Sequence, residues 1–142
     1  MLSEKEVQTL VERHNTLENL KDPLVELVER FCNARQTSYN GQAAPPEGKL
    51  GNRQFQDLAG KANATKSVNE IKNFIRYQIA RDGGWRQDNF GEELLVQLTK
   101  VAELARNDPE LHIQLVRLYF GYLNRHIRYL RKIAKAGQGG ER

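Results

Sequence analysis

The stretch GYLNRHIRYLRKIAK, residues 121–135, carries five Lys and Arg side chains and no acidic residue. Exposed helices are usually stabilised by Glu–Lys pairs one turn apart, so a helix with one sign of charge indicates a different use. Closely spaced cations bind phosphate groups because each contact releases a condensed counterion. We therefore expect Arg125, Arg128 and Lys132 to contact a nucleic-acid backbone.

A second basic segment lies at residues 65–86. One face of the helix predicted there combines the cations Lys72 and Arg76 with amide side chains, which suit an approach to a sugar-phosphate backbone. For both segments the alternative is a solvated face without a ligand, with the last cations favouring the negative end of the helix. The predicted RNA-binding residues are Lys66, Lys72, Arg76, Arg81, Arg125, Arg128 and Lys132.

Other chemistries find little support in the sequence. Three histidines lack metal-ligand spacing, and the single cysteine, Cys32, allows neither an intramolecular disulfide nor a CxxC metal pair. Nucleophile-elbow, Walker and HExxH motifs do not occur. We expect no metal, no cofactor and no enzymatic activity.

Helical periodicity of the apolar residues predicts an all-α fold, a compact bundle of five to six helices. Capping patterns mark helix starts at Ser3, Ser67 and Asn89, and an acid before proline marks two more, at Asp22 and Asp108. The helices are predicted at about 3–21, 23–36, 52–62, 67–82, 89–106 and 109–135.

The chain is expected to form a single domain over residues 1–142. Residues 1–36 would be a helical hairpin, with Val7, Leu10, His14 and Leu17 on the inward face of its first helix. The hairpin would dock on the rest of the molecule. The remaining parts would be a Pro/Gly-rich loop at 37–51, a core bundle at 52–136 and a mobile tail at 137–142.

The last predicted helix carries two adjacent apolar stripes that together cover more than half of its circumference. It should therefore be the central, mostly buried helix, and its exposed strip would be the cationic one. Tyr122, His126 and Tyr129 belong to the second stripe and are expected in the interior.

Charge is distributed unevenly although the net charge is only +4. Segments 49–86 and 111–142 are basic, whereas 1–48 and 87–110 are acidic, so an acidic patch of one copy could meet a basic patch of the next. The N-terminus is charged and lacks an apolar secretory segment, and no apolar run approaches the ~20 residues of a membrane span. We expect a cytoplasmic protein without a membrane partner.

Residues 55–131 resemble the Csm-type small subunit of type III CRISPR effector complexes. The resemblance rests on FQDLAGKANA (55–64), SVNEIKNFIRYQIAR (67–81) and the aromatic, basic LVRLYFGYLNRHIRYLRK (115–132). Residues 1–50, the Pro-Pro loop and the GGW turn match no part of that family's pattern, which leaves the subtype open.

The resemblance implies a non-catalytic, all-helical subunit of a crRNA-guided ribonucleoprotein. Several copies would stack head to tail and hold the backbone of the target RNA and crRNA without reading bases, beside other subunits. Lys72 and Arg76 on the capped helix, and Arg125, Arg128 and Lys132 on the last one, would face the RNA. Two alternatives are a helical protein–protein adaptor without nucleic acid and, less well supported for lack of a helix-turn-helix, a small DNA-binding regulator.

Overall fold

The computed structural model describes residues 1–35, 37–39, 42–44, 51–81 and 83–139. These residues form six α-helices: α1 (Glu4–Arg35), α2 (Asn52–Ala64), α3 (Val68–Arg81), α4 (Gly83–Arg86), α5 (Phe90–Leu104) and α6 (Pro109–Gly139). A short 3₁₀ turn, η1 (Gln87–Asn89), joins α4 to α5. The predicted all-α class and the long C-terminal helix are confirmed.

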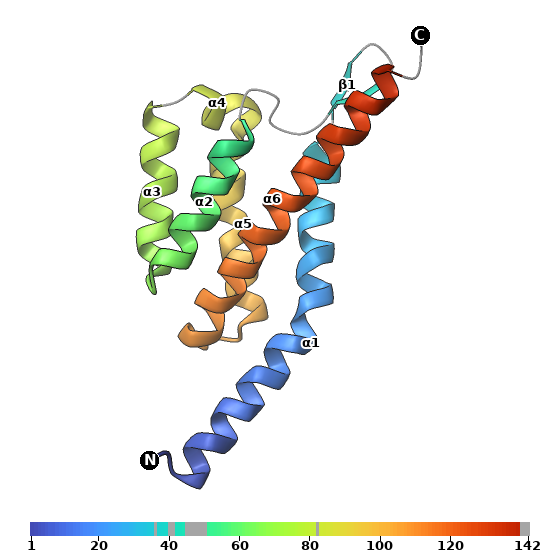
Figure 1. The fold of residues 1–142 in the computed structure, drawn as a ribbon. Helices are drawn as coiled ribbons and strands as arrows, with labels where there is room; N and C mark the ends of the chain where they lie inside the picture. The colour runs from blue at the N-terminus through green and yellow to red at the C-terminus, as the bar shows by residue number, and fades with distance from the viewer. Residues whose placement is uncertain (36, 40–41, 45–50, 82, 140–142) are drawn as a thin grey trace.

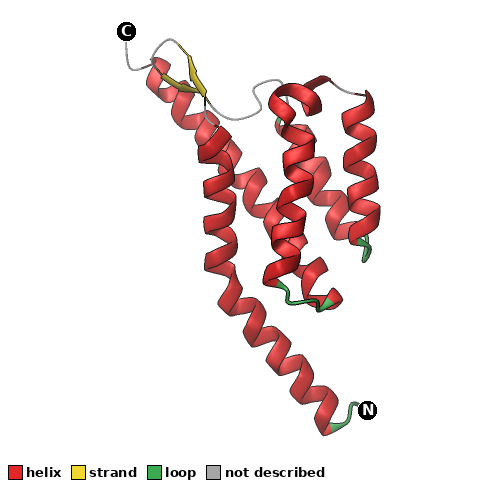
Figure 2. Ribbon diagram, turned by 180° about the vertical axis from the view of Figure 1, so that it is seen from behind, coloured by secondary structure: helices red, strands yellow, loops and turns green. Residues whose placement is uncertain are grey.

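Helix α6 runs diagonally through the molecule and packs against α1, α2, α3 and α5 (Figure 1). Its side chains from Leu111 to Ile127 supply a large share of the core, which also includes Phe55 and Leu58 of α2 and Leu94 and Leu98 of α5. Burying each of these side chains contributes roughly 1.5–3 kcal/mol. The helices α2, α3 and α5 lie on one side of α6, and the part of α1 that packs on α6 lies on the other (Figures 1 and 2).

The expected helical hairpin at residues 1–36 is wrong, because α1 is one helix with Pro23 inside it. Proline removes one backbone hydrogen bond and bends a helix without necessarily ending it. Leu17 and Leu20 before Pro23, and Leu24 and Leu27 after it, all pack against the core. This shared packing keeps the helix continuous across the proline, and α1 is visibly bent (Figure 1).

The N-terminal part of α1 extends beyond the bundle, towards the chain end marked N (Figures 1 and 2). Val7 and Leu10, which were expected to face inward, are 46% and 49% exposed. His14 is exposed as well, and only Leu17 of that predicted face packs against the core.

The segment predicted as a loop at 37–51 contains a short antiparallel pair, β1 (Thr37–Tyr39) and β2 (Gln42–Ala44), with Ser38 opposite Ala43. Its Pro-Pro dipeptide lies outside the described residues. The predicted mobile tail begins inside α6, which continues to Gly139, and residues 140–142 lie outside the described part of the chain.

Three of the predicted helix starts have the expected caps. The Ser3 hydroxyl accepts from the Glu6 N–H at 3.1 Å, and the Ser67 hydroxyl accepts from the Glu70 N–H at the same distance. Asp108 accepts from the N–H groups of Glu110 and Leu111. The predicted cap at Asn89 is absent: this residue has a left-handed backbone and makes no side-chain cap bond.

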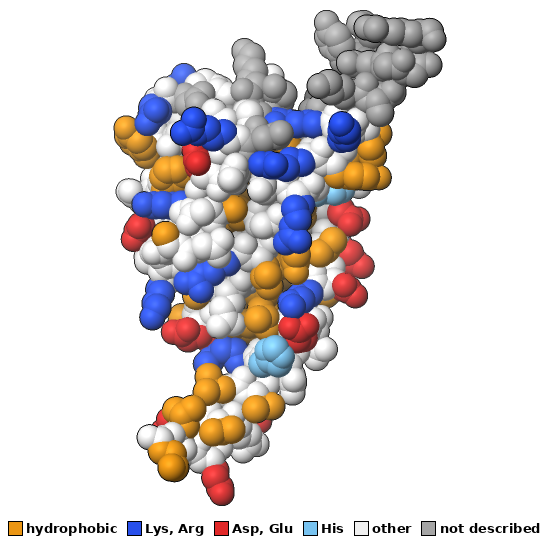
Figure 3. Space-filling view, in the orientation of Figure 1, with side chains coloured by type: hydrophobic (Ala, Val, Ile, Leu, Met, Phe, Trp, Pro, Cys, Tyr) orange, Lys and Arg blue, Asp and Glu red, His pale blue; other side chains and the backbone are white. Residues whose placement is uncertain are grey.

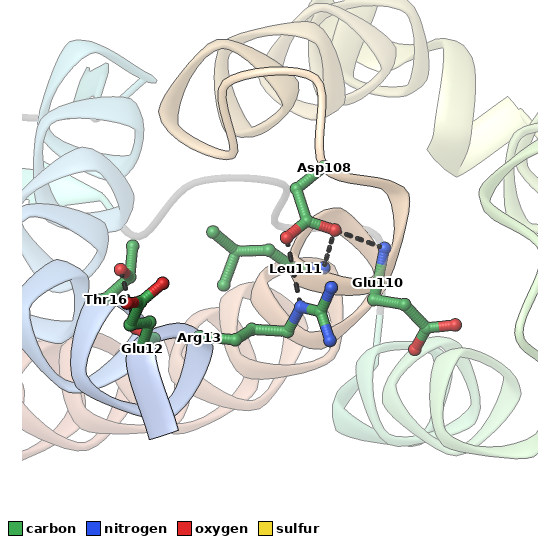
Figure 4. Close-up of polar contacts among 6 residues, drawn as sticks. All are labelled: Glu12, Arg13, Thr16, Asp108, Glu110 and Leu111. Carbon is green, nitrogen blue, oxygen red and sulfur yellow. Dashed lines mark hydrogen bonds and ion pairs between the residues drawn. The ribbon is translucent and has the colours of Figure 1, made fainter. Parts of the chain in front are cut away.

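Two arginines attach α1 to the rest of the bundle. Arg13 Nε donates to Asp108 Oδ2 at 3.0 Å, where α6 begins (Figure 4). At the other end of α1, Arg35 forms an ion pair with Glu93 of α5 and donates to the Asp88 carbonyl at 3.0 Å. Its guanidinium also lies 5.1 Å from the centre of the Phe90 ring.

Gly91 allows α3 and α5 to approach closely. A Cβ atom at this position would lie 2.7 Å from Cδ1 of Ile79 and 3.1 Å from the Trp85 carbonyl oxygen. We expect Gly91→Ala to lower the free energy of unfolding by about 1–3 kcal/mol through overpacking. Gly60→Ala is the control, because a Cβ there has no neighbour within 4 Å, and it should raise stability by about 0.5–1 kcal/mol. Urea unfolding of both variants is the measurement, and an unchanged midpoint for Gly91→Ala would contradict the packing.

The Asp108 carboxyl generates a pH-dependent prediction. Burial alone would raise its pKa, but hydrogen bonds from Arg13 and from the Leu111 and Glu110 N–H groups outweigh burial and lower the pKa below 3.8. A carboxyl whose pKa is lowered by folding stabilises the folded state at pH values above its unfolded-state pKa. This contribution is lost as the pH falls through the folded-state pKa. Asp108→Asn keeps the cap but loses the charge, so it should cost about 0.5–1 kcal/mol at neutral pH, and this difference should shrink as the pH falls below the ordinary range of an aspartate. Urea midpoints across this pH range test it, and a constant difference would refute the ionic contribution.

Candidate nucleic-acid interface

Helix α6 exposes one cationic strip along the side that the bundle leaves open. From Leu111 to Ile133 this helix contains no Asp or Glu. The cations of this stretch differ in exposure. Arg125, Arg128 and Lys132 are exposed, whereas Arg117 and Arg131 are half-buried. We call Arg125, Arg128 and Lys132 the α6 strip.

Arg117 is engaged inside the fold. Its Nε donates to the Ala62 carbonyl at 3.1 Å, and a terminal nitrogen donates to the Thr65 carbonyl at 2.8 Å. The last carbonyls of a helix lack partners within the helix, so Arg117 caps the C-terminal end of α2. This cation holds α2 against α6 and is not counted among the ligand-binding candidates.

Arg125 and Arg128 make only weak internal contacts by comparison. Arg125 Nε donates to the Gly121 carbonyl at 3.3 Å, and its guanidinium lies 5.4 Å from the Tyr122 ring centre. Arg128 donates to Asn124 Oδ1 at 3.2 Å and to Gln56 Oε1 of α2 at 3.5 Å. Within the described residues neither guanidinium is ion-paired with a carboxylate. Both charges are therefore available to an external anion.

A hollow of about 420 Å³ adjoins the strip between α1, α2 and α6. Arg125 lines it together with Lys21 of α1 and two amide side chains, Asn63 of α2 and Gln114 of α6. Lys21 donates to Glu18 at 2.8 Å, and this hydrogen bond raises the pKa of Lys21. Cations beside amide groups are the side chains that bind phosphate and sugar oxygens.

The space-filling view in Figure 3 shows Lys and Arg side chains spread over α2, α3 and α6 on this face. Lys66 is exposed in the connection between α2 and α3, next to the Thr65 carbonyl that Arg117 binds. Arg81 is exposed at the end of α3, with its guanidinium 5.6 Å from the Tyr77 ring centre.

Lys72 lies on α3 near the start of α6, away from the α6 strip. Lys72 is half-buried, and its charge is felt by His112 in the first turn of α6. Burial lowers the pKa of His112, a bond to the Leu98 carbonyl opposes this, and Lys72 lowers it further. His112 precedes Arg125 by thirteen positions, about 20 Å along the helix axis. Arg76 is exposed one turn beyond Lys72 on α3.

The expectation that Tyr122, His126 and Tyr129 all lie in the core is wrong. Tyr122 and His126 are half-buried, and Tyr129 is 59% exposed. Among the α6 side chains that the structure describes, the second apolar stripe is fully buried as far as Tyr119 and exposed at Tyr129 and Ile133, so it leaves the bundle along the helix. Tyr129 stacks on His126, with ring centres 6.0 Å apart, beside the exposed cations. An exposed aromatic ring next to cations is a surface on which a base can stack.

Sequence reasoning missed Lys21, Gln56, Asn63 and Gln114 as neighbours of the strip. Helical spacing places Gln56 and Asn63 off the apolar face that Phe55 and Leu58 form, so the sequence could have predicted that these two amide side chains are exposed. Which helix lies beside α6 depends on the bundle topology, and no local pattern in the sequence reports it.

Comparison with models of protein families, with curated proteins and with solved structures found no match. Over the described residues, none of the helices combines the length and apolar composition that crossing a bilayer requires. The same part of the chain contains no cluster of three His, Cys, Asp or Glu side chains arranged to hold a metal ion.

The different contacts of Arg117 and Arg128 predict different effects on stability. Arg117→Met should lower the free energy of unfolding by about 1–3 kcal/mol, because it leaves two carbonyls of the α2 end without their donor. Arg128→Met removes an exposed side chain and should change stability by less than about 0.5 kcal/mol. Urea unfolding of the two variants tests the distinction, and equal losses would show that Arg128 is also a structural residue.

Proposed function

We propose that this protein binds the sugar-phosphate backbone of single-stranded RNA through the α6 strip, without reading the bases. The observation that carries the proposal is the set of exposed cations along a stretch of α6 that contains no acidic residue. Arg125 and Arg128 have no carboxylate partner within the described chain, so a phosphate would not have to displace one. The hollow beside Arg125 and the exposed Tyr129 ring supply amide and stacking surfaces next to these charges.

We further propose that the chain is a non-catalytic small subunit of a type III CRISPR ribonucleoprotein. Support comes from the resemblance of residues 55–64, 67–81 and 115–132 to that family. In this proposal the crRNA and target strand run along the α6 strip, and several copies stack head to tail beside the other subunits. Lys66 and Arg81 are peripheral contacts, and Lys72 and Arg76 form a separate contact on α3.

Salt dependence gives a quantitative test of backbone binding. The variant Arg125→Gln/Arg128→Gln/Lys132→Gln removes three phosphate contacts. The slope of log K against log salt should therefore become shallower by about 2, since each contact to a single strand contributes about 0.7. Fluorescence anisotropy with two unrelated single-stranded RNAs should give similar affinities and the same change in slope.

The matched control is Lys5→Gln/Arg30→Gln/Lys100→Gln, which removes the same charge from exposed positions on α1 and α5. It should retain the wild-type slope. Absence of RNA binding by the wild-type protein, or an equal loss in both triple variants, would refute the proposed interface and favour the adaptor function. Binding of one RNA sequence that persists at high salt would refute recognition without base reading.

A further inference from the structure

The first turns of α1 form an arm that extends beyond the bundle (Figures 1 and 2). We define the N-terminal arm as residues 4–12, because Arg13 is the first residue of α1 tied to another helix, through Asp108. Val7, Leu10 and Val11 are 46%, 49% and 52% exposed. Their spacing of three and four residues places them on one side of the helix, so the arm carries an apolar stripe in solvent.

The arm continues the packed part of α1, so its helix is already nucleated, but its Val7, Leu10 and Val11 side chains are left largely in water. Most helical stability in proteins comes from packing of an apolar face. A partner that covers the stripe of Val7, Leu10 and Val11 would therefore stabilise the arm. Glu4, Glu6 and Glu12 outnumber Lys5, the one cation in the arm, so neither phosphates nor an anionic membrane suits it.

We propose that the partner is a second copy of this chain, with the two arms packed antiparallel about a two-fold axis near the middle of the arm. In the register that places Val7 opposite Leu10 of the second copy, each apolar stripe covers the other. On one flank, Glu6 then lies beside Arg13 of the second copy, and symmetry repeats this pair. The charge pattern of the arm is thus complementary to itself when the second copy is reversed.

The contacts of Arg13 are compatible with this pair. Its Nε donates to Asp108 Oδ2, and a guanidinium has further N–H donors on its terminal nitrogens (Figure 4). In a parallel pair, each glutamate would instead lie beside the same glutamate of the second copy, and the two bundles would crowd together at one end of the arms. The antiparallel arrangement sends the bundles to opposite ends of the paired arms.

A contact between two short arms is smaller than the roughly 800 Å² per partner of a standard interface, so the dimer should be weak and dependent on concentration. Pairing of the arms goes beyond the proposed RNA binding and uses a different surface. The α6 strip belongs to the C-terminal half of α6, which runs to the opposite end of the molecule from the arm (Figure 1), so pairing of the arms should leave it exposed.

Sedimentation velocity over about 10 µM to 1 mM protein tests the proposal in the expected affinity range. The wild-type chain should shift from monomer to dimer with rising concentration.

Leu10→Lys places a charge in the centre of the stripe and should leave the protein monomeric, with an unchanged urea midpoint at low concentration. Val96→Lys is the matched control, since Val96 on α5 is 53% exposed, and this variant should still dimerise. Glu6→Arg should weaken the dimer by about tenfold or less, because it sets like charges together on the flank.

Three outcomes would overturn the arm dimer. A wild-type protein that stays monomeric throughout the range has no such contact. Loss of association in Val96→Lys would place the arm in the groove between α1 and α5 of the next copy, which Val96 lines. Species that grow beyond the dimer would show a head-to-tail contact. The arm dimer and the RNA-binding proposal can be tested independently. Leu10→Lys should keep wild-type RNA affinity at low protein concentration. The triple variant of the α6 strip should still dimerise.

Discussion

The two-sided burial of α6 is the constraint on which the rest of the structure depends. Apolar side chains cover most of its circumference, and they can leave water only if other helices pack on both sides. The helices α2, α3 and α5 occupy one side and α1 the other. What remains is a narrow strip, and the exposed cations Arg125, Arg128 and Lys132 lie on it. The exposed cations of α6 are therefore aligned as a consequence of how the core is built.

Arginine has two separate uses in this protein, and contacts rather than residue type tell them apart. Arg13, Arg35 and Arg117 join helices through carboxylate or carbonyl oxygens. These three are structural ties, since a planar guanidinium can bind several oxygens at once. Arg125 and Arg128 reach only nearby groups on their own helix and the Gln56 amide. Within the described residues neither of them is paired with a carboxylate.

The molecule has two surfaces whose requirements the isolated fold does not meet. The α6 strip presents positive charge without negative partners among the described residues, and the N-terminal arm presents apolar side chains to water. The two lie on different helices and differ in chemistry, so one ligand cannot satisfy both. A polyanion fits the first, and an apolar, charge-complementary helix fits the second. The two proposals, RNA binding and arm pairing, therefore rest on separate surfaces.

Local sequence patterns were enough to predict the all-α class, the capped starts at Ser3, Ser67 and Asp108, and the cationic strip of the last helix, because each depends on residues within a few turns of one another. They did not determine that Pro23 lies inside one long helix, that Val7 and Leu10 face solvent, or that Tyr129 is exposed. Those outcomes depend on where the neighbouring helices end, and helical periodicity reports which residues share a face but not whether that face is covered. The tertiary contacts show what the sequence does not, namely that Arg117 caps the end of α2 and that the charge of Lys72 acts on His112 at the start of α6. The reason is that the partners of a long cationic side chain come from distant segments that only folding brings together.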